Sequence, residues 1–240
     1  GASTTSLPPG STKGGQCITV VGTNFGTAPP EVFFGPYPAA VIAHDTVGHT
    51  WVVLASPEGF GTGLVLRVKV GNQDANSTYS YKAPLIQSVS PTEGPTSGKN
   101  AVGQPIVMTI TGSNFGATSK AGARNAREVR ITPTCKECDA DKGPYPYVIK
   151  VAPEAFIDDS HDRLRFYMPE GYGVNAKVSV RVGNQDSVQT SYFTYSQPKI
   201  TSLTSFCGTT QQCRAPTERF ETDGCADLRL WEEYTEWVAR

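Results

Sequence analysis

Five short blocks of this sequence occur twice, in the same order along the chain. The two copies are GTNFG at 22–26 and GSNFG at 112–116, GPYP at 35–38 and 143–146, PEGFG at 57–61 and PEGYG at 169–173, VGNQD at 70–74 and 182–186, and PLI at 84–86 and PKI at 198–200. Blocks that repeat in order predict two copies of one structural module. The offset between copies rises from 90 at the first block to 108 at the second, which predicts an insertion of 18 residues in the second copy, at about residues 117–142.

Each copy contains a run in which apolar and variable positions alternate. In residues 64–70 and 176–182, one set of alternate positions is apolar in both copies, whereas the other set changes freely between valine, arginine, lysine and serine. A period of two with one apolar face predicts a strand that packs on a core and exposes its other face. The same comparison places Val52 and Leu54 of the first copy in the core.

Composition narrows the class of protein further. The 24 glycines and 18 prolines among 240 residues lie between short β-branched runs, as expected for many strands joined by turns. No apolar run approaches the roughly 18 residues that a membrane helix needs. The formal net charge of −1 argues against a nucleic-acid partner, because phosphate binding depends on a basic surface.

The motifs, taken in order, resemble the IPT/TIG family of immunoglobulin-like domains. They are PLIQSVSPTEGP at 84–95, ITGSNFG at 110–116, PEGYG at 169–173, the valine-rich run at 176–182 and FTY at 193–195. The resemblance implies an all-β fold with two tandem early-set β-sandwiches. We expect modules at residues 1–83 and 84–197, followed by a cysteine-containing, partly helical tail or truncated further module at 198–240. Because the connection between the modules is short and contains Pro84, we also expect little freedom between them.

Six cysteines and one glycosylation sequon favour an oxidising, secreted or cell-surface setting. The sequon makes Asn76 the candidate N-glycosylation site, and Cys17 is either a buried thiol in a core-type strand or a link to another chain. The disulfide candidates are Cys17, Cys135, Cys138, Cys207, Cys213 and Cys225. Their pairing stays open, because six cysteines allow about 15 connectivities.

Motifs that could carry chemistry are weak. Cys135 and Cys138 form a CxxC pair, but no second pair accompanies it as a zinc site would require, and a redox pair would open a helix. The acidic segments 139–143 and 158–162 lack the further ligands of a calcium loop and are predicted as solvated turns. The glycine-rich segment 59–63 precedes a strand, so it is predicted as a turn. With no nucleophile motif present, we expect no catalytic residue, metal or cofactor.

Two features indicate a binding surface. The first copy places Trp51, Val53 and Val65 on outward positions where the second copy has charged residues, which suggests a covered face. The alternatives are chance surface variation and cover by the insertion of the second copy. The insertion is the second feature, because a long loop on a β-scaffold often carries recognition. Its basic candidates are Lys120, Arg124, Arg127 and Arg130.

These observations favour a non-enzymatic extracellular spacer and protein-interaction fragment of a surface receptor, adhesin or filament-forming protein. The expected partner is another protein, with a glycan as a possible ligand and a membrane reached only through parts outside this chain. One alternative is a carbohydrate-binding accessory module of a secreted enzyme, in which Trp51 would stack on sugars. Another is an intracellular transcription-factor module, which the neutral charge, the cysteines and the sequon disfavour.

Overall fold

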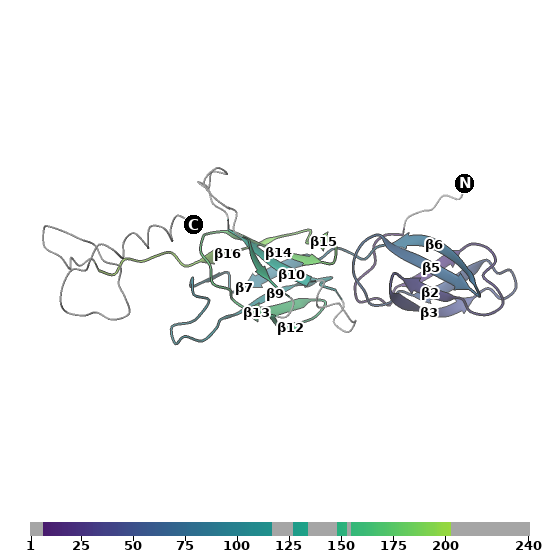
Figure 1. Ribbon diagram of the computed structural model, residues 1–240, viewed down its shortest axis with the longest axis horizontal. Coiled ribbons are helices and arrows are strands. Elements are labelled where there is room, and N and C mark those ends of the chain that lie inside the picture. Colours follow the sequence, from purple (N-terminus) through teal and green to yellow (C-terminus); the bar gives the residue numbers. More distant parts are fainter. Residues whose placement is uncertain (1–6, 117–126, 134–147, 153–154, 203–240) are drawn as a thin grey trace, which may run out of the picture. The chain divides into compact units, whose positions relative to one another are not determined.

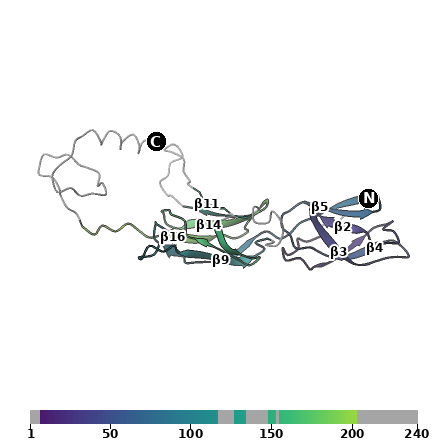
Figure 2. The same ribbon diagram turned by 60° about the horizontal axis from the view of Figure 1, so that its bottom comes forward.

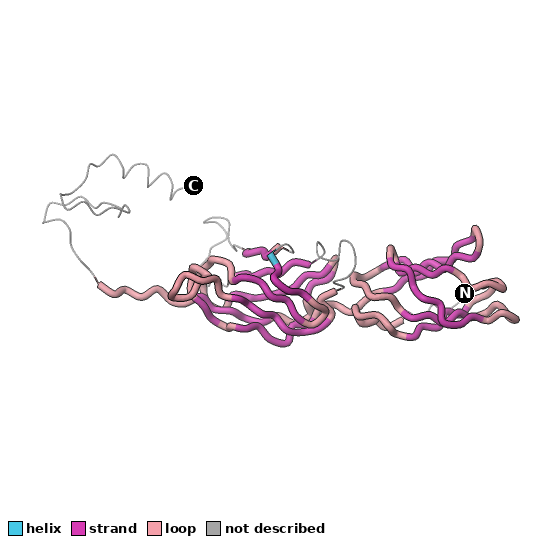
Figure 3. The backbone as a smooth tube through the Cα atoms, turned by 90° about the horizontal axis from the view of Figure 1, so that it is seen from below, coloured by secondary structure: helices cyan, strands magenta, loops and turns pink. Residues whose placement is uncertain are grey.

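The computed structural model describes residues 7–116, 127–133, 148–152 and 155–202. The chain divides into two compact units, Gly1–Gln197 and Pro198–Arg240, and the account that follows concerns the first. We call its residues up to 83 module 1 and residues 84–197 module 2. Strands and loops make up almost all of the described backbone (Figure 3), and none of its helices has the length and apolarity needed to cross a membrane.

Module 1 contains six strands in one hydrogen-bonded sheet, several of which are labelled in Figure 1. They are β1 (Cys17–Val21), β2 (Glu31–Phe34), β3 (Tyr37–His44), β4 (Trp51–Ala55), β5 (Leu64–Val70) and β6 (Gln73–Tyr79). Their order is β1-β4-β3-β2-β5-β6, and all neighbours are antiparallel. Residues 37–39 of β3 pair with β2, and residues 40–44 pair with β4, with a bulge between Val41 and Ala43. The sheet therefore folds over at β3 into two layers around one core.

Module 2 repeats this pattern with two separate sheets, which lie on opposite sides of its core in Figure 2. Its strands are β7 (Leu85–Ser90), β8 (Glu93–Gly94), β9 (Val107–Ser113), β10 (Arg127–Thr132), β11 (Ile149–Val151), β12 (Phe156–Asp159), β13 (Arg163–Tyr167), β14 (Ala176–Val182), β15 (Gln185–Asp186) and β16 (Ser191–Tyr195). One sheet has the order β12-β13-β9-β7; the other has β11-β10-β14-β16-β8, with β15 beside β14. The counterpart of β3 is divided here into β11 and β12, and within the described residues of module 2 no single strand pairs with both layers.

The predicted all-β sandwiches are confirmed, and so is the burial pattern that predicted them. Val52 and Leu54 are fully buried, as are Val178 and Val180 in module 2, and each module has its own core cluster. The alternating positions of β5 and β14 thus face the core, as a period of two requires.

The prediction of one uninterrupted insertion at 117–142 is wrong. Residues 127–132 form β10, which pairs with β14 in the register that β2 adopts with β5. The extra residues are therefore divided between the two sides of a core strand. Offsets between repeated motifs give only the net number of added residues, so they could not show this division.

A buried tyrosine ends the strand pattern of each module and ties it to an earlier loop. The Tyr81 hydroxyl donates to the Pro57 carbonyl oxygen at 2.8 Å, and the Tyr195 hydroxyl donates to the Pro169 carbonyl oxygen at 3.0 Å. Both tyrosines are at most 1 % exposed, and burial raises the pKa of Tyr81 well above its ordinary value. The neutral, donating phenol is therefore the form that the fold stabilises.

We expect Tyr81→Phe to lower the free energy of unfolding by about 1–3 kcal/mol, because the Pro57 carbonyl then loses a buried donor. Urea unfolding measures the loss. Tyr167→Phe, at a tyrosine that is 55 % exposed, is the control and should change little. Equal stability of the two variants would contradict the role of the Tyr81 hydrogen bond.

Candidate functional site

The loop between β4 and β5 carries Phe60, which packs against both hydrophobic cores. Gly61 and Gly63 give this loop its two positive φ angles, 98° and 69°, so the turn predicted at 59–63 is confirmed. On the module 1 side, the Phe60 ring lies 6.1 Å from the ring of Tyr37, in an edge-on arrangement. Phe60 therefore belongs to the packing of two sandwiches at once.

On the module 2 side, Phe60 lies against two glycines. A Cβ added to Gly183 would lie 3.1 Å from Cδ2 of Phe60, and one added to Gly116 would lie 3.6 Å from its Cβ. The same Gly116 position is 3.0 Å from Cγ1 of Val182. The absence of side chains at the two glycines thus leaves a socket into which the aromatic ring fits.

His161 connects the two modules through both of its ring nitrogens. Nδ1 lies 2.9 Å from the Thr12 hydroxyl, and Nε2 lies 2.7 Å from Oε1 of Glu58. The side chains of His161 and Glu58 are only 15 % and 27 % exposed, and Thr12 is 1 % exposed. A largely buried, charge-assisted contact of this kind is stronger than an exposed ion pair.

Further hydrogen bonds surround this centre. The Asn184 side chain accepts from the Thr62 amide at 3.1 Å and donates to the Thr62 carbonyl at 3.3 Å. The Gln185 side chain donates to the Tyr81 carbonyl at 3.1 Å. In all three bonds a side chain of module 2 contacts a backbone group of module 1.

One exposed ion pair lies at the edge of the junction. Lys13 and Asp162 are 2.6 Å apart, but each side chain is more than half exposed, so solvent screens most of its contribution. We call the contacts of Phe60, His161, Asn184, Gln185 and Asp162 the junction.

The row of hydroxyl, imidazole and carboxylate formed by Thr12, His161 and Glu58 has the composition of a nucleophile, a base and an orienting acid. Its geometry does not support catalysis, because burial of Thr12 keeps its hydroxyl out of reach of a substrate. Among the described residues, no group of three histidine, cysteine or acidic side chains could hold a metal ion. The arrangement can instead fix the relation of one module to the next.

The interaction-face residues predicted from sequence lie on two different layers. Trp51 and Val53 are on β4, and their cross-strand partners on β1 are Val21 and Thr19. With Cys17, Ala40, Ala43 and Ala55 they form the outer face of β1, β4 and β3, which carries no charged side chain. Trp51 is 38 % exposed and Val21 is 78 % exposed. We call this surface the β1–β4–β3 outer face.

Val65 lies on the other layer and shares its outer face with Asn76. Val65 is 52 % exposed, and Arg67, two residues further along β5, points the same way and pairs across the strands with Asn76. Asn76 is exposed and stands on β6, at the edge of the sheet. The three predicted apolar residues therefore do not form one patch.

The basic-patch prediction fails at Arg127. This residue begins β10 and is 1 % exposed, because the strand places it opposite Val182 at the end of the core. Lys120 and Arg124 lie outside the described residues.

The cysteine predictions are tested at one position only. Cys17 is exposed, and within the described part of the chain it is a free cysteine. It is therefore not the buried thiol that a core-type strand suggested, since its side chain falls on the outward set of β1 positions. Cys135, Cys138, Cys207, Cys213 and Cys225 lie outside the described residues, as does the acidic segment 139–143.

With this geometry in view, comparison with known proteins gives a clear family match. The model of the IPT/TIG domain matches residues 2–83 and again residues 84–195. The chain belongs to the IPT/TIG family. No curated protein matches it.

Several solved structures are also similar to this chain, at low sequence identity. A surface glycan-binding protein of Prevotella bryantii is 16 % identical, with a TM-score of 0.43, over 80 % of this chain and 38 % of its own. The plexin A4 extracellular region is 16 % identical, with a TM-score of 0.36, over 78 % of this chain and 17 % of its own. The I9–I11 tandem of titin is 10 % identical, with a TM-score of 0.30, over 80 % of this chain and 64 % of its own. This IPT/TIG chain thus spans well under half of the first two proteins.

Sequence reasoning missed the junction of the two IPT/TIG modules, although a signal for it was present. Residues 158–162 were predicted as a solvated turn, whereas His161 and Asp162 contact module 1. His49 and His161 are 112 residues apart, the same offset as the blocks around Gly59 and Gly71. A histidine retained at matching places in two otherwise divergent loops indicates a shared role.

Proposed function

We propose that the chain is a non-enzymatic extracellular spacer and protein-interaction fragment of a larger surface receptor, adhesin or filament-forming protein. The observation that carries the proposal is the junction. Two sandwiches that share the packing of Phe60 and the buried contacts of His161 hold a defined relation to each other. Such a unit sets the distance and angle between whatever lies at its two ends.

The β1–β4–β3 outer face supplies the interaction surface in this proposal. It is apolar where the equivalent face of module 2 carries Arg163 and Arg165, paired across the strands with Thr111 and Thr109. An apolar surface at a position that tolerates charge is typical of a face that a protein partner covers.

A glycan on Asn76 would cover the layer of β5 and β6 and would leave the β1–β4–β3 outer face accessible to a partner. It would project from the layer that carries Val65 and would shield the edge strand β6 from pairing with other chains. The proposed secretory location and the proposed disulfides fit the same setting.

The experiment compares the wild-type chain with two variants that copy module 2 residues into module 1. Trp51→Arg with Val53→Arg charges the β1–β4–β3 outer face, and Val65→Lys, which copies Lys177, charges the opposite layer as a matched control. Each chain is screened on a panel of extracellular protein domains and on a glycan array. We expect protein binding that the double variant weakens at least about tenfold and that Val65→Lys leaves intact.

Equal losses in the two variants would show that this face is not the contact. Binding on the glycan array that disappears with the Trp51 substitution would favour the carbohydrate-binding alternative, which the exposure of Trp51 supports. A shift of duplex DNA at low salt would favour the transcription-factor alternative.

A further inference from the structure

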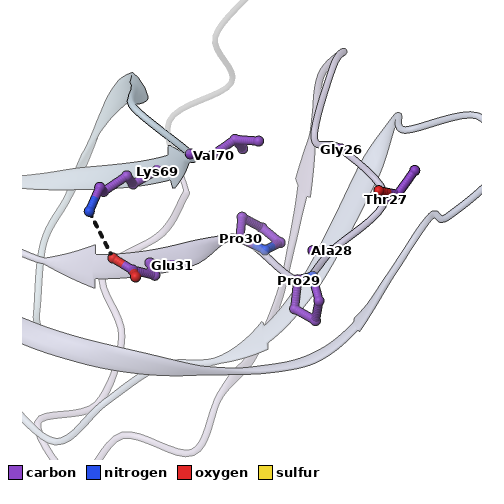
Figure 4. A pocket seen from close by; sticks show the side chains of 9 residues that line it. Gly26, Thr27, Ala28, Pro29, Pro30, Glu31, Lys69 and Val70 are labelled. Carbon is purple, nitrogen blue, oxygen red and sulfur yellow. Dashed lines mark hydrogen bonds and ion pairs between the residues drawn. The ribbon is translucent and has the colours of Figure 1, made fainter.

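A cavity of about 320 Å³ opens at the end of module 1 that lies opposite the junction in its own fold. Figure 4 shows its lining side chains, with the ion pair between Lys69 and Glu31 at 3.3 Å along one side. Six of the lining residues matter here: Gly26, Pro30, Glu31, Lys69, Val70 and Gly71. They come from the β1–β2 connection and the start of β2, and from the end of β5 and the turn that follows it.

These six positions are the module 1 counterparts of the socket that holds Phe60. The repeat offsets and the strand registers match them, in order, to Gly116, Arg127, Glu128, Arg181, Val182 and Gly183. In module 2, Phe60 fills the space in front of Gly183. In module 1, nothing lies within 4 Å of the Cβ position of Gly71.

The polar groups that surround the socket are also repeated at the open end. The side chains that contact module 1 from module 2 include Asn114, His161, Asn184 and Gln185. Their counterparts in module 1 are Asn24, His49, Asn72 and Gln73. The loop bonds confirm the histidine match, because the Phe25 amide donates to the His49 carbonyl as the Phe115 amide donates to that of His161.

The complementary half of the junction is repeated at the far end of module 2. Tyr172 stands where module 1 has Phe60, and Glu170 stands where it has Glu58. Thr96 is the counterpart of Thr12. The Gly171 amide donates to the Thr96 carbonyl at 2.9 Å, as the Gly59 amide donates to the Thr12 carbonyl at 3.0 Å. The contacts of Asn184 with Thr62 involve only the backbone N–H and C=O of Thr62, and Val174 is the residue at the equivalent place.

Burial distinguishes the junction from its two counterparts. Thr12 is buried and its counterpart Thr96 is exposed. Val182 is 1 % exposed, whereas Val70 is only partly buried. Tyr172 is 47 % exposed. The described part of modules 1 and 2 thus contains one junction, in which Phe60 is the plug, together with a counterpart of the plug at Tyr172 and a counterpart of the socket at Gly26, Val70 and Gly71.

We propose that a second copy of this chain docks its Tyr172 into the cavity at Gly26, Val70 and Gly71, so that copies join head to tail. The contact repeats the junction, with Glu170 and Thr96 of one copy facing His49 of the next. It is a heterologous interface, which does not close as a symmetric dimer and builds an open row when the rotation from one copy to the next does not close a ring. It uses the ends of the sandwiches, so it is separate from the β1–β4–β3 outer face.

Two differences from the junction weaken this contact. Lys13 and Asp162 are replaced by Ser97 and Thr50, so the exposed ion pair is missing. His49 is turned toward its own loop, with Nδ1 2.8 Å from the Gly26 carbonyl oxygen, and must rotate to face a partner. A contact between copies also lacks the short tether that gives modules in one chain an effective concentration in the millimolar range. We expect a dissociation constant on the order of 100 μM.

Sedimentation equilibrium of the full chain from micromolar to millimolar concentration tests the proposal. Tyr172→Ala removes the plug. Gly71→Asn blocks the socket, and asparagine tolerates the positive φ of 60° at that position better than other side chains do. We expect the wild-type chain to form concentration-dependent species beyond the dimer, and each variant alone to lose at least tenfold in association constant.

A mixture of the two variants distinguishes a head-to-tail contact from any other. One variant keeps the socket and the other keeps the plug, so together they should form a one-to-one dimer and nothing larger. Tyr192→Ala, which removes an exposed tyrosine away from the ends, and the Trp51→Arg/Val53→Arg variant are controls that should associate like the wild type. A wild-type chain that stays monomeric at millimolar concentration, or variants that associate normally, would overturn the proposal.

Discussion

Phe60→Ala is expected to destabilise both modules together, although only one residue of module 1 is changed. Complete burial would make the loss about 3–5 kcal/mol; Phe60 is partly buried, so we expect about 2–3 kcal/mol. Because its ring packs on both core clusters, the loss should be shared. Hydrogen exchange measured on peptides from β5 and from β14 should show weaker protection in both modules.

The matched control for this prediction is Tyr172→Ala, the same position in the second repeat. Tyr172 is 47 % exposed, so its truncation should lower stability far less. Unchanged exchange in β14 of the Phe60→Ala variant would show that the two sandwiches are packed independently.

Gly112→Ala is expected to be the most damaging single-methyl change in module 2. A Cβ at Gly112 would lie 2.0 Å from the Leu85 carbonyl oxygen and 2.6 Å from the Phe115 ring. The first of these atoms belongs to the backbone of β7, which pairs with β9 here and bulges between Ile86 and Ser88. Separating the two strands should cost about 3 kcal/mol, the upper end of what overpacking usually costs. Thermal or urea unfolding measures the loss.

The repeat supplies the comparison for this prediction. Gly22 occupies the same place in module 1, where the nearest atoms of the described residues belong to the side chain of Phe25, at 2.8 Å from the added Cβ. A ring can shift more readily than a paired backbone, so Gly22→Ala should cost roughly 1 kcal/mol. Equal losses at the two glycines would mean that the approach of β7 does not explain the requirement at Gly112.

The sandwich fold could be predicted from sequence because it depends on local periodicity. Alternation in 64–70 and 176–182 identified the strands, and comparison of the two copies identified the buried face. Residues that change between copies while their neighbours stay apolar mark the solvent side of a strand. Val53 of module 1, which is replaced by Arg165 at the equivalent position of module 2, is an example.

The junction could not be predicted in the same way, because no period connects Phe60 with Gly183 or Glu58 with His161. Each of these residues has an ordinary place within its own module. Their role in the junction depends on a contact between loops that are distant in sequence. Arg127 shows a related limit: its position next to inserted residues suggested a surface loop, whereas pairing with β14 places it in a buried strand.

The continuity of β3 has a mechanical consequence. In module 1 a single strand is hydrogen-bonded to both layers, so pulling the layers apart must break backbone bonds along β3. In module 2 the same path is divided into β11 and β12, and the two sheets adhere mainly through side-chain packing. Under tension applied across the sandwiches, module 2 is therefore the compliant element of the pair and module 1 the stiff one.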